Sequence, residues 1–286
     1  MKKKNKKLFG DPLLRHIVVF DIFAIIFLFS AFQLFMYWND NRDSRKHNDK
    51  LIQQAVSVVT TDPNVTPANP TGSGEQGDQE DEEALRLSAS IPITVDFDVL
   101  NQENPNIIAW IYCDGTPINY PVVQGQDNQY YLRRLPDGSS NPSGSLFADF
   151  RNDRNFVDLN TLIYGHNMSD DSMFGTLTDY KNPSYYEEHP QFWILTKEKA
   201  YLVDLIAGYV TGSDSDAYKL YENKTDLQAH LRAAMEESTF TPKDVDIDQV
   251  EQIVTLSTCS YEYSTARYVL VGSMTPVEYP KTTSTS

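Results

Sequence analysis

The sequence predicts a mainly β domain, an eight-stranded barrel or sandwich, that follows an N-terminal segment apolar enough to cross a membrane. Short runs of apolar and β-branched residues alternate with turn signals between residues 107 and 272. Only one stretch in this part, 224–237, has apolar residues at clear helical spacing. The predicted folded part is about 190 residues long, which is within the usual size of one domain with its own core.

The chain begins with a basic tail, 1–16, which contains five of the lysines. An apolar stretch of 22 residues, 17–38, follows it, and a helix needs about 20 residues to cross the hydrocarbon core. A signal peptide has a shorter apolar region of about 7–15 residues, so a retained anchor is favoured. The lysines then place the N-terminus in the cytosol and the rest of the chain outside the cell membrane.

Residues 39–83 are predicted to connect the anchor to the domain. The first part, 39–58, has the composition of a short juxtamembrane helix. The second part, 60–83, is rich in proline, glycine and acidic residues, a composition that cannot bury a core. We expect this part to be a flexible acidic linker that holds the domain off the membrane.

The folded domain is predicted to cover 84–279, and a polar tail, 280–286, ends the chain. Its first element is expected to be a short helix at 95–100. The eight strands are then expected at 107–112, 118–123, 145–148, 160–164, 192–195, 200–210, 251–258 and 267–272. The helix at 224–237 falls in the long insert between the sixth and seventh of these strands.

Charge excludes some classes of partner. The chain has 40 Asp and Glu residues against 24 Lys and Arg, a formal net charge of −16. Six of the basic residues but only two of the acidic ones precede residue 39, so the exported part is more acidic than the whole chain. Such a charge argues against nucleic acid and against anionic lipid as partners.

The two cysteines, Cys113 and Cys259, lie in different settings. Cys113 ends an apolar run that is typical of a buried strand, where a lone cysteine usually behaves as a small hydrophobic residue. An exported segment would permit a disulfide, but we expect both cysteines to be free.

Cys259 ends one predicted strand, and Arg267 begins the next. If the turn between them is centred on Tyr263, the two residues lie opposite each other, with Cβ atoms about 4.5–5.5 Å apart. A thiol beside a fixed cation is in an environment that favours the thiolate. Cys259 is therefore predicted to be a nucleophile.

Strand alternation divides the residues before Cys259 between two faces. Ile253, Thr255, Ser257 and Cys259 share one face, which we expect to line a groove. Val254, Leu256 and Thr258 share the other face, which we expect to point into the barrel.

His166 is the candidate partner of the cysteine. It follows Gly165 directly at the end of the predicted strand 160–164. Imidazole is the usual group for activating a cysteine or protonating a leaving amine. A lone histidine after a strand is more often structural, but the presence of Cys259 and Arg267 favours a catalytic role.

No metal or cofactor is expected, because no group of His, Cys and Asp has metal-ligand spacing and no glycine-rich phosphate loop is present. Asp149, Asp153 and Asp158 lie close together but lack the twelve-residue pattern of a calcium loop, so we expect a solvated loop. His189 is predicted to lie in a loop and His230 on a helix surface.

Two motifs resemble those of class B sortases, membrane-anchored cysteine transpeptidases of Gram-positive bacteria. They are Thr-Leu-Ser-Thr-Cys at 255–259, with an arginine eight residues later, and Tyr-Gly-His-Asn-Met at 164–168. Weaker matches occur in the same order as in the family at 106–111, 119–123, 127–132 and 173–177. The resemblance implies an eight-stranded sortase-like β-barrel with an N-terminal helical segment and a helix inserted before the cysteine strand.

The resemblance also implies roles for individual residues. Cys259 would be the nucleophile, His166 the acid and base, and Arg267 the group that steadies the substrate and the oxyanion. Ser257, Thr258 and Tyr218 would border the substrate. Some class B sortases have an acidic residue two positions after the cysteine, where this chain has Tyr261. The next residue, Glu262, is expected to point away, so the resemblance favours a Cys-His-Arg site.

The implied reaction is cleavage after threonine in a sorting signal near the C-terminus of a secreted protein, through a thioacyl intermediate that a peptidoglycan amine resolves. Two alternatives remain open. A cysteine endopeptidase would release the same intermediate to water, and a non-catalytic membrane-anchored binding module would not use Cys259 as a nucleophile.

Overall fold

The computed structural model describes residues 12–59, 84–243 and 245–280. The first part of the predicted basic tail, the predicted acidic linker at 60–83 and the end of the polar tail lie outside the described residues. The described residues fall into two compact units, with the boundary between Lys46 and His47.

The first unit consists of most of helix α1 (Pro12–Ala55). By length and composition, α1 is the one helix among the described residues that is long and apolar enough to cross a membrane. Large apolar side chains on it, such as Phe20, Phe23 and Phe27, are exposed, as expected for a helix that faces lipid. The predicted anchor at 17–38 lies within this helix.

The second unit begins with the last turns of α1. Strand β1 (Val56–Val58) then pairs antiparallel with β2 (Ile93–Val95), and helix α3 (Phe97–Glu103) follows. The side chain of Asp96 caps α3 by accepting hydrogen bonds from the amides of Asp98 and Val99. A short helix is therefore present here, but it begins after the predicted position 95, which belongs to a strand.

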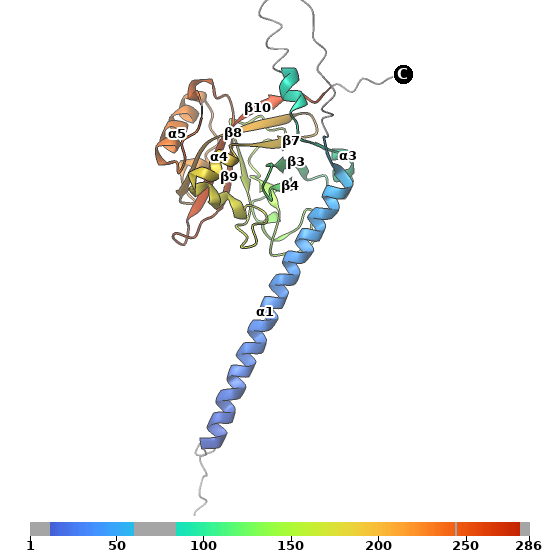
Figure 1. The fold of residues 1–286 in the computed structure, drawn as a ribbon, viewed down its shortest axis with the longest axis vertical. Helices are drawn as coiled ribbons and strands as arrows, with labels where there is room; N and C mark the ends of the chain where they lie inside the picture. Colours follow the sequence, from blue (N-terminus) through green and yellow to red (C-terminus); the bar gives the residue numbers. More distant parts are fainter. Residues whose placement is uncertain (1–11, 60–83, 244, 281–286) are drawn as a thin grey trace, which may run out of the picture. The chain divides into compact units, whose positions relative to one another are not determined.

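Eight strands form a closed barrel in the order β10-β8-β7-β3-β4-β5-β6-β9 (Figure 1). The prediction of an eight-stranded barrel is confirmed, and the sandwich alternative is wrong. The strands are β3 (Ile107–Tyr112), β4 (Asn119–Gln124), β5 (Leu146–Ala148), β6 (Asn160–Tyr164), β7 (Gln191–Leu195), β8 (Ala200–Thr211), β9 (Ile253–Cys259) and β10 (Arg267–Val277).

Two neighbouring pairs in the barrel, β4–β5 and β6–β9, are parallel, and the others are antiparallel. Parallel neighbours need a long crossover connection between them, and the connection from β6 to β9 contains β7, β8 and the insert. The β6–β9 register places Tyr164 opposite Ser257. The two strands that carry the predicted histidine and cysteine therefore end side by side.

The alternation predicted for β9 is confirmed in the core. Val254 and Leu256 belong to the cluster that fills the barrel with Ile111, Ile163 and Leu270. Ile253 belongs to a separate cluster on the outer face of the barrel. Thr255 is fully buried and donates a hydrogen bond to Asn160 Oδ1. The expected groove face is thus covered along most of β9 and open only near its end.

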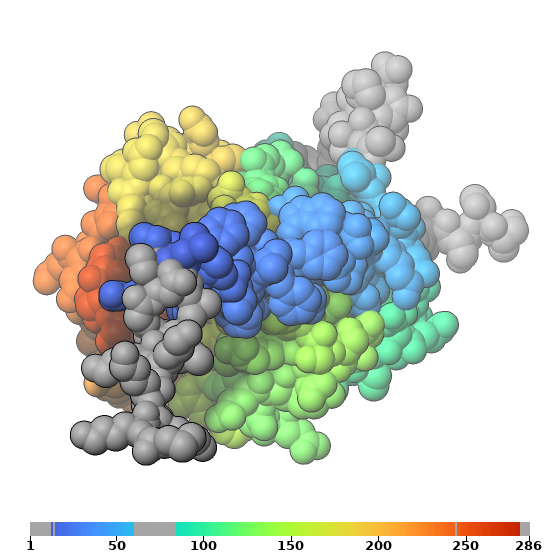
Figure 2. Space-filling view, turned by 90° about the horizontal axis from the view of Figure 1, so that it is seen from below, coloured from blue at the N-terminus to red at the C-terminus, as the bar shows by residue number. Residues whose placement is uncertain are grey.

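Besides α1 and α3, the segments outside the barrel include helices α4 (Pro183–Glu188) and α5 (Lys224–Glu237) and the short 3-10 helices η1 (Tyr131–Arg133), η2 (Gly175–Lys181), η3 (Asp216–Tyr218) and η4 (Ile247–Gln249). Helix α5 has the bounds that its apolar spacing predicts, and Leu227 and Leu231 pack in the outer cluster with Val269. In Figure 2 the yellow residues around α4 lie beside the orange residues of the insert, and the Tyr186 and Phe240 rings stack 4.2 Å apart between centroids.

Candidate active site

The six predicted site residues line one cleft with a volume of about 440 Å³. They come from three separate parts of the chain: the loop after β6, the end of β9 with the start of β10, and η3 in the insert. The residues are His166, Tyr218, Ser257, Thr258, Cys259 and Arg267. The structure therefore brings together every residue that the sequence singled out for this site.

Cys259 and Arg267 are directly paired residues of the antiparallel β9–β10 hairpin. The turn is centred on Tyr263, as predicted, and is closed by a hydrogen bond from the Ser260 amide to the Ala266 carbonyl. Both side chains are half-buried. The guanidinium of Arg267 donates to the Ala266 carbonyl at 3.0 Å. Within the described part of the chain, Arg267 takes part in no ion pair, so its charge is available to a substrate.

His166 is held beside β9 through the residues on either side of it. The Gly165 amide donates to the Ser257 carbonyl at 3.1 Å, and Thr258 Oγ1 donates to the Gly165 carbonyl at 2.9 Å. Asn167 Nδ2 donates to the Cys259 carbonyl at 2.6 Å. From the sequence, Asn167 had no predicted role of its own, although it belongs to the Tyr-Gly-His-Asn-Met motif at 164–168.

The loop needs glycine at position 165. A Cβ atom there would lie 2.4 Å from Leu146 Cδ2 and 2.6 Å from Phe174 Cδ2, which is well inside van der Waals contact. The absence of a side chain lets the end of β6 lie directly on the core, and His166 then follows at a defined position.

The imidazole of His166 has a backbone partner. Its Nε2 lies 2.8 Å from the Leu132 carbonyl oxygen. Because a carbonyl oxygen can only accept, Nε2 carries the proton, and in the neutral ring Nδ1 is the nitrogen that can accept one. Glu262 forms an ion pair with Lys181. This ion pair with Lys181 agrees with the expectation that Glu262 points away from His166.

Another part of the cleft lining is built around Asp149, whose side chain is fully buried. Its carboxylate accepts hydrogen bonds from Arg151 Nε at 2.8 Å, Tyr164 Oη at 2.8 Å and Asn128 Nδ2 at 2.9 Å. The prediction of a solvated loop is therefore wrong for Asp149. Burial opposes ionisation, but these hydrogen bonds outweigh it and lower the pKa of Asp149 to about 2.

Tyr218 joins this part of the cleft lining to the cysteine strand. Its hydroxyl shares a 2.8 Å hydrogen bond with Ser257 Oγ, and its ring stacks on that of Tyr164 with centroids 6.1 Å apart. Arg151 Nη2 also donates to the Tyr218 carbonyl at 3.3 Å. Burial raises the pKa of Tyr218, so its hydroxyl stays protonated and can donate.

A larger cavity of about 820 Å³ lies between the segment 209–222 and α5. It shares Arg151 and Tyr218 with the cleft, but neither the cysteine nor the histidine of the site lines it. His230 does line it and is half-buried, with its ring 5.4 Å from that of Tyr221, so the prediction of a simple helix-surface residue is wrong. Of these two cavities, only the smaller one is lined by Cys259 and His166.

Both cysteines are free, as expected. Cys113 is 1% exposed and donates from Sγ to the Gln191 carbonyl. Burial raises the pKa of the Cys113 thiol, which disfavours the reactive thiolate. Only Cys259 combines access to a cleft with a neighbouring cation.

Comparison with known proteins identifies relatives along most of the chain. Sortase B of Listeria monocytogenes is 32% identical over 252 residues, which cover 87% of this chain and 92% of the relative. Sortase B of Staphylococcus aureus is 35% identical over 184 residues, or 63% and 75% of the two chains. No family model matches the chain.

Solved structures show the same fold. The Staphylococcus aureus sortase B–substrate complex matches with a TM-score of 0.64 and 27% identity, over 84% of this chain and 99% of the other. Sortase B of Clostridium perfringens matches with a TM-score of 0.58 and 30% identity, over 63% and 100%. With a relative of this identity and coverage, the chain belongs to the sortase B family, cysteine transpeptidases that attach proteins to the cell wall.

Proposed function

We propose that Cys259, His166 and Arg267 are the catalytic residues of this transpeptidase, and that its substrate is a secreted protein with a threonine-containing sorting signal near its C-terminus. The observation that carries the proposal is the direct pairing of Cys259 with Arg267 at the end of a cleft. His166 supports it, because hydrogen bonds from both of its chain neighbours attach it to the same strand end.

In the acylation step, Cys259 Sγ attacks the carbonyl carbon of threonine in the sorting signal. His166 Nδ1 takes the thiol proton, since Nε2 is committed to the Leu132 carbonyl. Negative charge develops on the carbonyl oxygen, and the permanently charged Arg267 stabilises it. The peptide C–N bond then breaks, and the proton on Nδ1 passes to the leaving amine.

In the second step, an amine of the peptidoglycan attacks the thioester. His166 accepts a proton from this amine and returns it to the departing cysteine sulfur. The products are a new amide bond and the free enzyme. If water attacks instead, the same residues make the protein a cysteine endopeptidase.

The residues predicted to border the substrate contribute in different ways. The hydroxyls of Tyr218 and Ser257 are bonded to each other at the cleft wall, where an extended peptide would pass over them. The Thr258 side chain is nearly fully buried and holds Gly165. We infer that Thr258 supports the histidine loop more than it touches the peptide.

For the whole chain, we propose a single-pass protein of the cell membrane with 1–16 in the cytosol, 17–38 as the anchor and 39–83 as the connection. The catalytic domain, 84–279, and the tail, 280–286, then lie outside. The exposed apolar face of α1 and the preceding lysines support this orientation. A membrane-impermeant thiol reagent should label Cys259 on intact protoplasts; labelling only after permeabilisation would contradict the orientation.

The reaction is tested with peptides of the form x-Pro-x-Thr-x, incubated with and without an amine acceptor and analysed by mass spectrometry. The proposal expects a ligated product with the amine and none with the Cys259→Ala variant. The Cys113→Ala variant is the matched control and should retain turnover. Hydrolysed product alone at every amine concentration would favour the endopeptidase, and normal turnover by Cys259→Ala would exclude cysteine catalysis. An unreactive Cys259 with no product would favour the binding module.

A further inference from the structure

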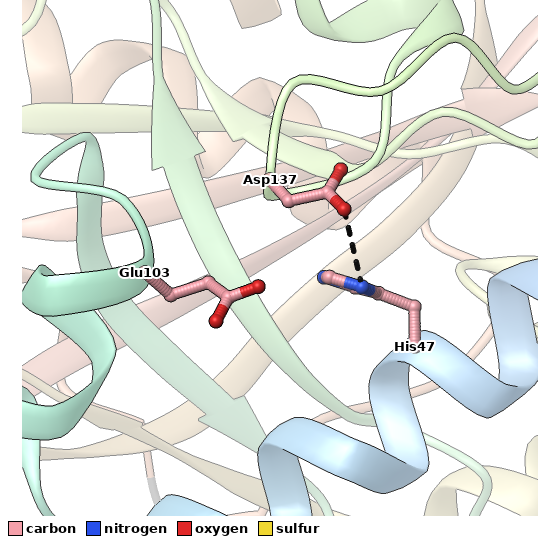
Figure 3. A group of neighbouring side chains, drawn as sticks. All are labelled: His47, Glu103 and Asp137. Carbon is pink, nitrogen blue, oxygen red and sulfur yellow. Dashed lines mark ion pairs between the residues drawn. The ribbon is translucent and has the colours of Figure 1, made fainter.

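Three side chains from separate segments of the second unit meet away from the catalytic cleft (Figure 3). His47 comes from the end of α1, Glu103 from the end of α3, and Asp137 from the loop after η1. His47 Nδ1 lies 3.6 Å from Asp137 Oδ2. One nitrogen or oxygen ligand atom from each of the three residues lies within 4.8 Å of the others.

The imidazole of His47 is the feature that the fold leaves unexplained. Its side chain is only 10% exposed. Its Nε2 atom is buried and has no hydrogen-bond partner among the described residues. A buried polar atom without a partner costs free energy, so its position calls for a reason. Figure 3 shows the ring lying between the two carboxylates.

The two acidic groups are arranged around this ring. The Asp137 Oδ1 atom accepts a hydrogen bond from the Ser139 amide at 2.8 Å, and this orients Oδ2 toward His47. Burial, the largest influence, lowers the pKa of His47 against the opposing effect of Asp137 and Glu103. A neutral imidazole between two carboxylates has a lone pair to offer and two negative charges beside it.

This set of donors fits a transition-metal ion. Imidazole nitrogen and carboxylate oxygen bind Zn²⁺ at about 2.0–2.2 Å, and three protein ligands leave a fourth tetrahedral position for water. Such bonds separate neighbouring ligand atoms by about 3.5 Å, and the three ligand atoms already lie within 4.8 Å of one another, so each needs to move only slightly to reach this distance. Ca²⁺ and Mg²⁺ prefer oxygen ligands alone, so the imidazole disfavours them.

Lys50 is the competitor for this site. Its Nζ lies 3.1 Å and 3.2 Å from the two carboxylate oxygens of Glu103. About half of the Lys50 side chain is exposed, and exposed ion pairs of this kind contribute little to stability. The lysine can therefore turn into solvent when a cation takes its place, and removing its charge should favour the cation.

We propose that His47, Glu103 and Asp137 bind one divalent transition-metal ion such as Zn²⁺. The ion cross-links the last turns of α1 to α3 and to the loop at Asp137. These turns continue the same helix that contains the candidate membrane span. The metal thus fixes the segment through which the chain enters the catalytic domain.

The test is isothermal titration of the full-length protein in detergent micelles with Zn²⁺ at neutral pH. The Cys259→Ala variant serves as the parent, because it removes the accessible thiol as a second zinc ligand. The expected result is one equivalent of Zn²⁺, with His47→Gln and Asp137→Asn each weakening binding at least tenfold. Lys50→Gln should tighten it several-fold. Asp49→Asn, which changes an exposed carboxylate on the same helix, is the matched control and should bind as the parent.

A second measurement guards against misfolded variants. In the presence of EDTA, the thermal unfolding midpoint of each variant should equal that of the parent, and added Zn²⁺ should raise the midpoint of the parent but not of His47→Gln. The proposal is overturned if the parent binds no stoichiometric Zn²⁺, if His47→Gln and Asp137→Asn bind it equally well, or if Lys50→Gln weakens binding.

Discussion

The residues that line the cleft are held in place by two different means. Cys259 and His166 are positioned by hydrogen bonds of the backbone and of the neighbouring Asn167 and Thr258. By contrast, the buried carboxylate of Asp149 collects donors from Arg151, Tyr164 and Asn128. The first arrangement positions the reactive residues through their backbone and their chain neighbours, and the second holds its side chains in a network around one buried carboxylate.

This difference separates catalysis from stability. A reactive group that is already engaged in strong hydrogen bonds would have to break them in each turnover. In a structural network such as that of Asp149, every hydrogen bond adds to the stability of the fold. Substitutions of the reactive residues should therefore change the rate more than the stability. Substitutions in the Asp149 network should do the reverse.

The largest effect is expected for Arg267→Ala. Loss of the cation that we propose stabilises the oxyanion should lower kcat/KM by about 10²–10³-fold. The change in unfolding free energy should stay below about 0.5 kcal/mol, because the side chain is half-buried and its only hydrogen bond among the described residues is to the neighbouring Ala266 carbonyl. Arg267→Lys keeps the positive charge but not the planar set of donors, so its kcat/KM should lie between those of the wild type and Arg267→Ala. The exposed Arg133→Ala serves as control. A loss of stability as large as the loss of activity would assign Arg267 a structural role.

Asp149→Asn should mainly affect stability. The pKa of Asp149 is lowered from 3.8 to about 2 in the folded protein, and a shift of this size corresponds to about 2 kcal/mol. Because the folded pKa is the lower one, this contribution is complete above about pH 4 and is lost as the pH falls toward 2.

Urea denaturation of Asp149→Asn at pH 7 and near pH 2 measures this contribution. The wild-type advantage of about 2 kcal/mol at pH 7 should vanish at the lower pH. Asp153→Asn, an exposed carboxylate in the same loop, should show neither effect. An Asp149→Asn protein as stable as the wild type at pH 7 would show that the Asp149 network does not contribute to the unfolding free energy.

A smaller effect is expected for Asn167→Ala, which removes the hydrogen bond to the Cys259 carbonyl. We expect a loss of about 1 kcal/mol in stability and about tenfold in kcat, since His166 would be less firmly placed beside the cysteine. Steady-state kinetics and thermal unfolding measure the two. The exposed Asn155→Ala should leave kcat unchanged, and an unchanged kcat in Asn167→Ala would show that Gly165 alone positions the histidine.

The smallest effect is expected for Tyr218→Phe. This change keeps the ring that stacks on Tyr164 but removes the hydrogen bond to Ser257 Oγ. Loss of this hydrogen bond should weaken substrate binding by about 0.5–1.5 kcal/mol and so raise KM a few-fold. Ser257→Ala should have a similar effect, and the double variant should add little to either. Fully additive effects would mean that the two hydroxyls act on the substrate independently.

How far the sequence predicts the structure depends on how local each feature is. The β9–β10 hairpin was predicted down to the pairing of Cys259 with Arg267, because its turn lies within a few residues of both strands. Helix α5 was predicted with its bounds from one apolar face. The β1–β2 ribbon was missed, since strands of three residues are too short to show a pattern.

Contacts between segments that are far apart in the chain could not be predicted from the sequence pattern. Asp149 lies in a loop with several charged residues, which indicates solvent exposure, yet its donors include Asn128 and Tyr164 from other segments. The sequence shows no metal-ligand spacing, and the three residues of the His47 cluster lie far apart along the chain. Their proximity arises only when α1, α3 and the loop at Asp137 pack together.

The sequence by itself determined the strands, the inserted helix, the apolar N-terminal helix and the cysteine–arginine pair, because each depends on residues close together in the chain. The tertiary structure alone decided how His166 comes to lie beside Cys259. The hydrogen bond that fixes this arrangement joins Asn167 to Cys259, which are 92 positions apart in the chain. It can form because β6 and β9 pair in parallel. A parallel pair must be closed across a long crossover, so its register is set by packing of the whole barrel and not by any local run of residues.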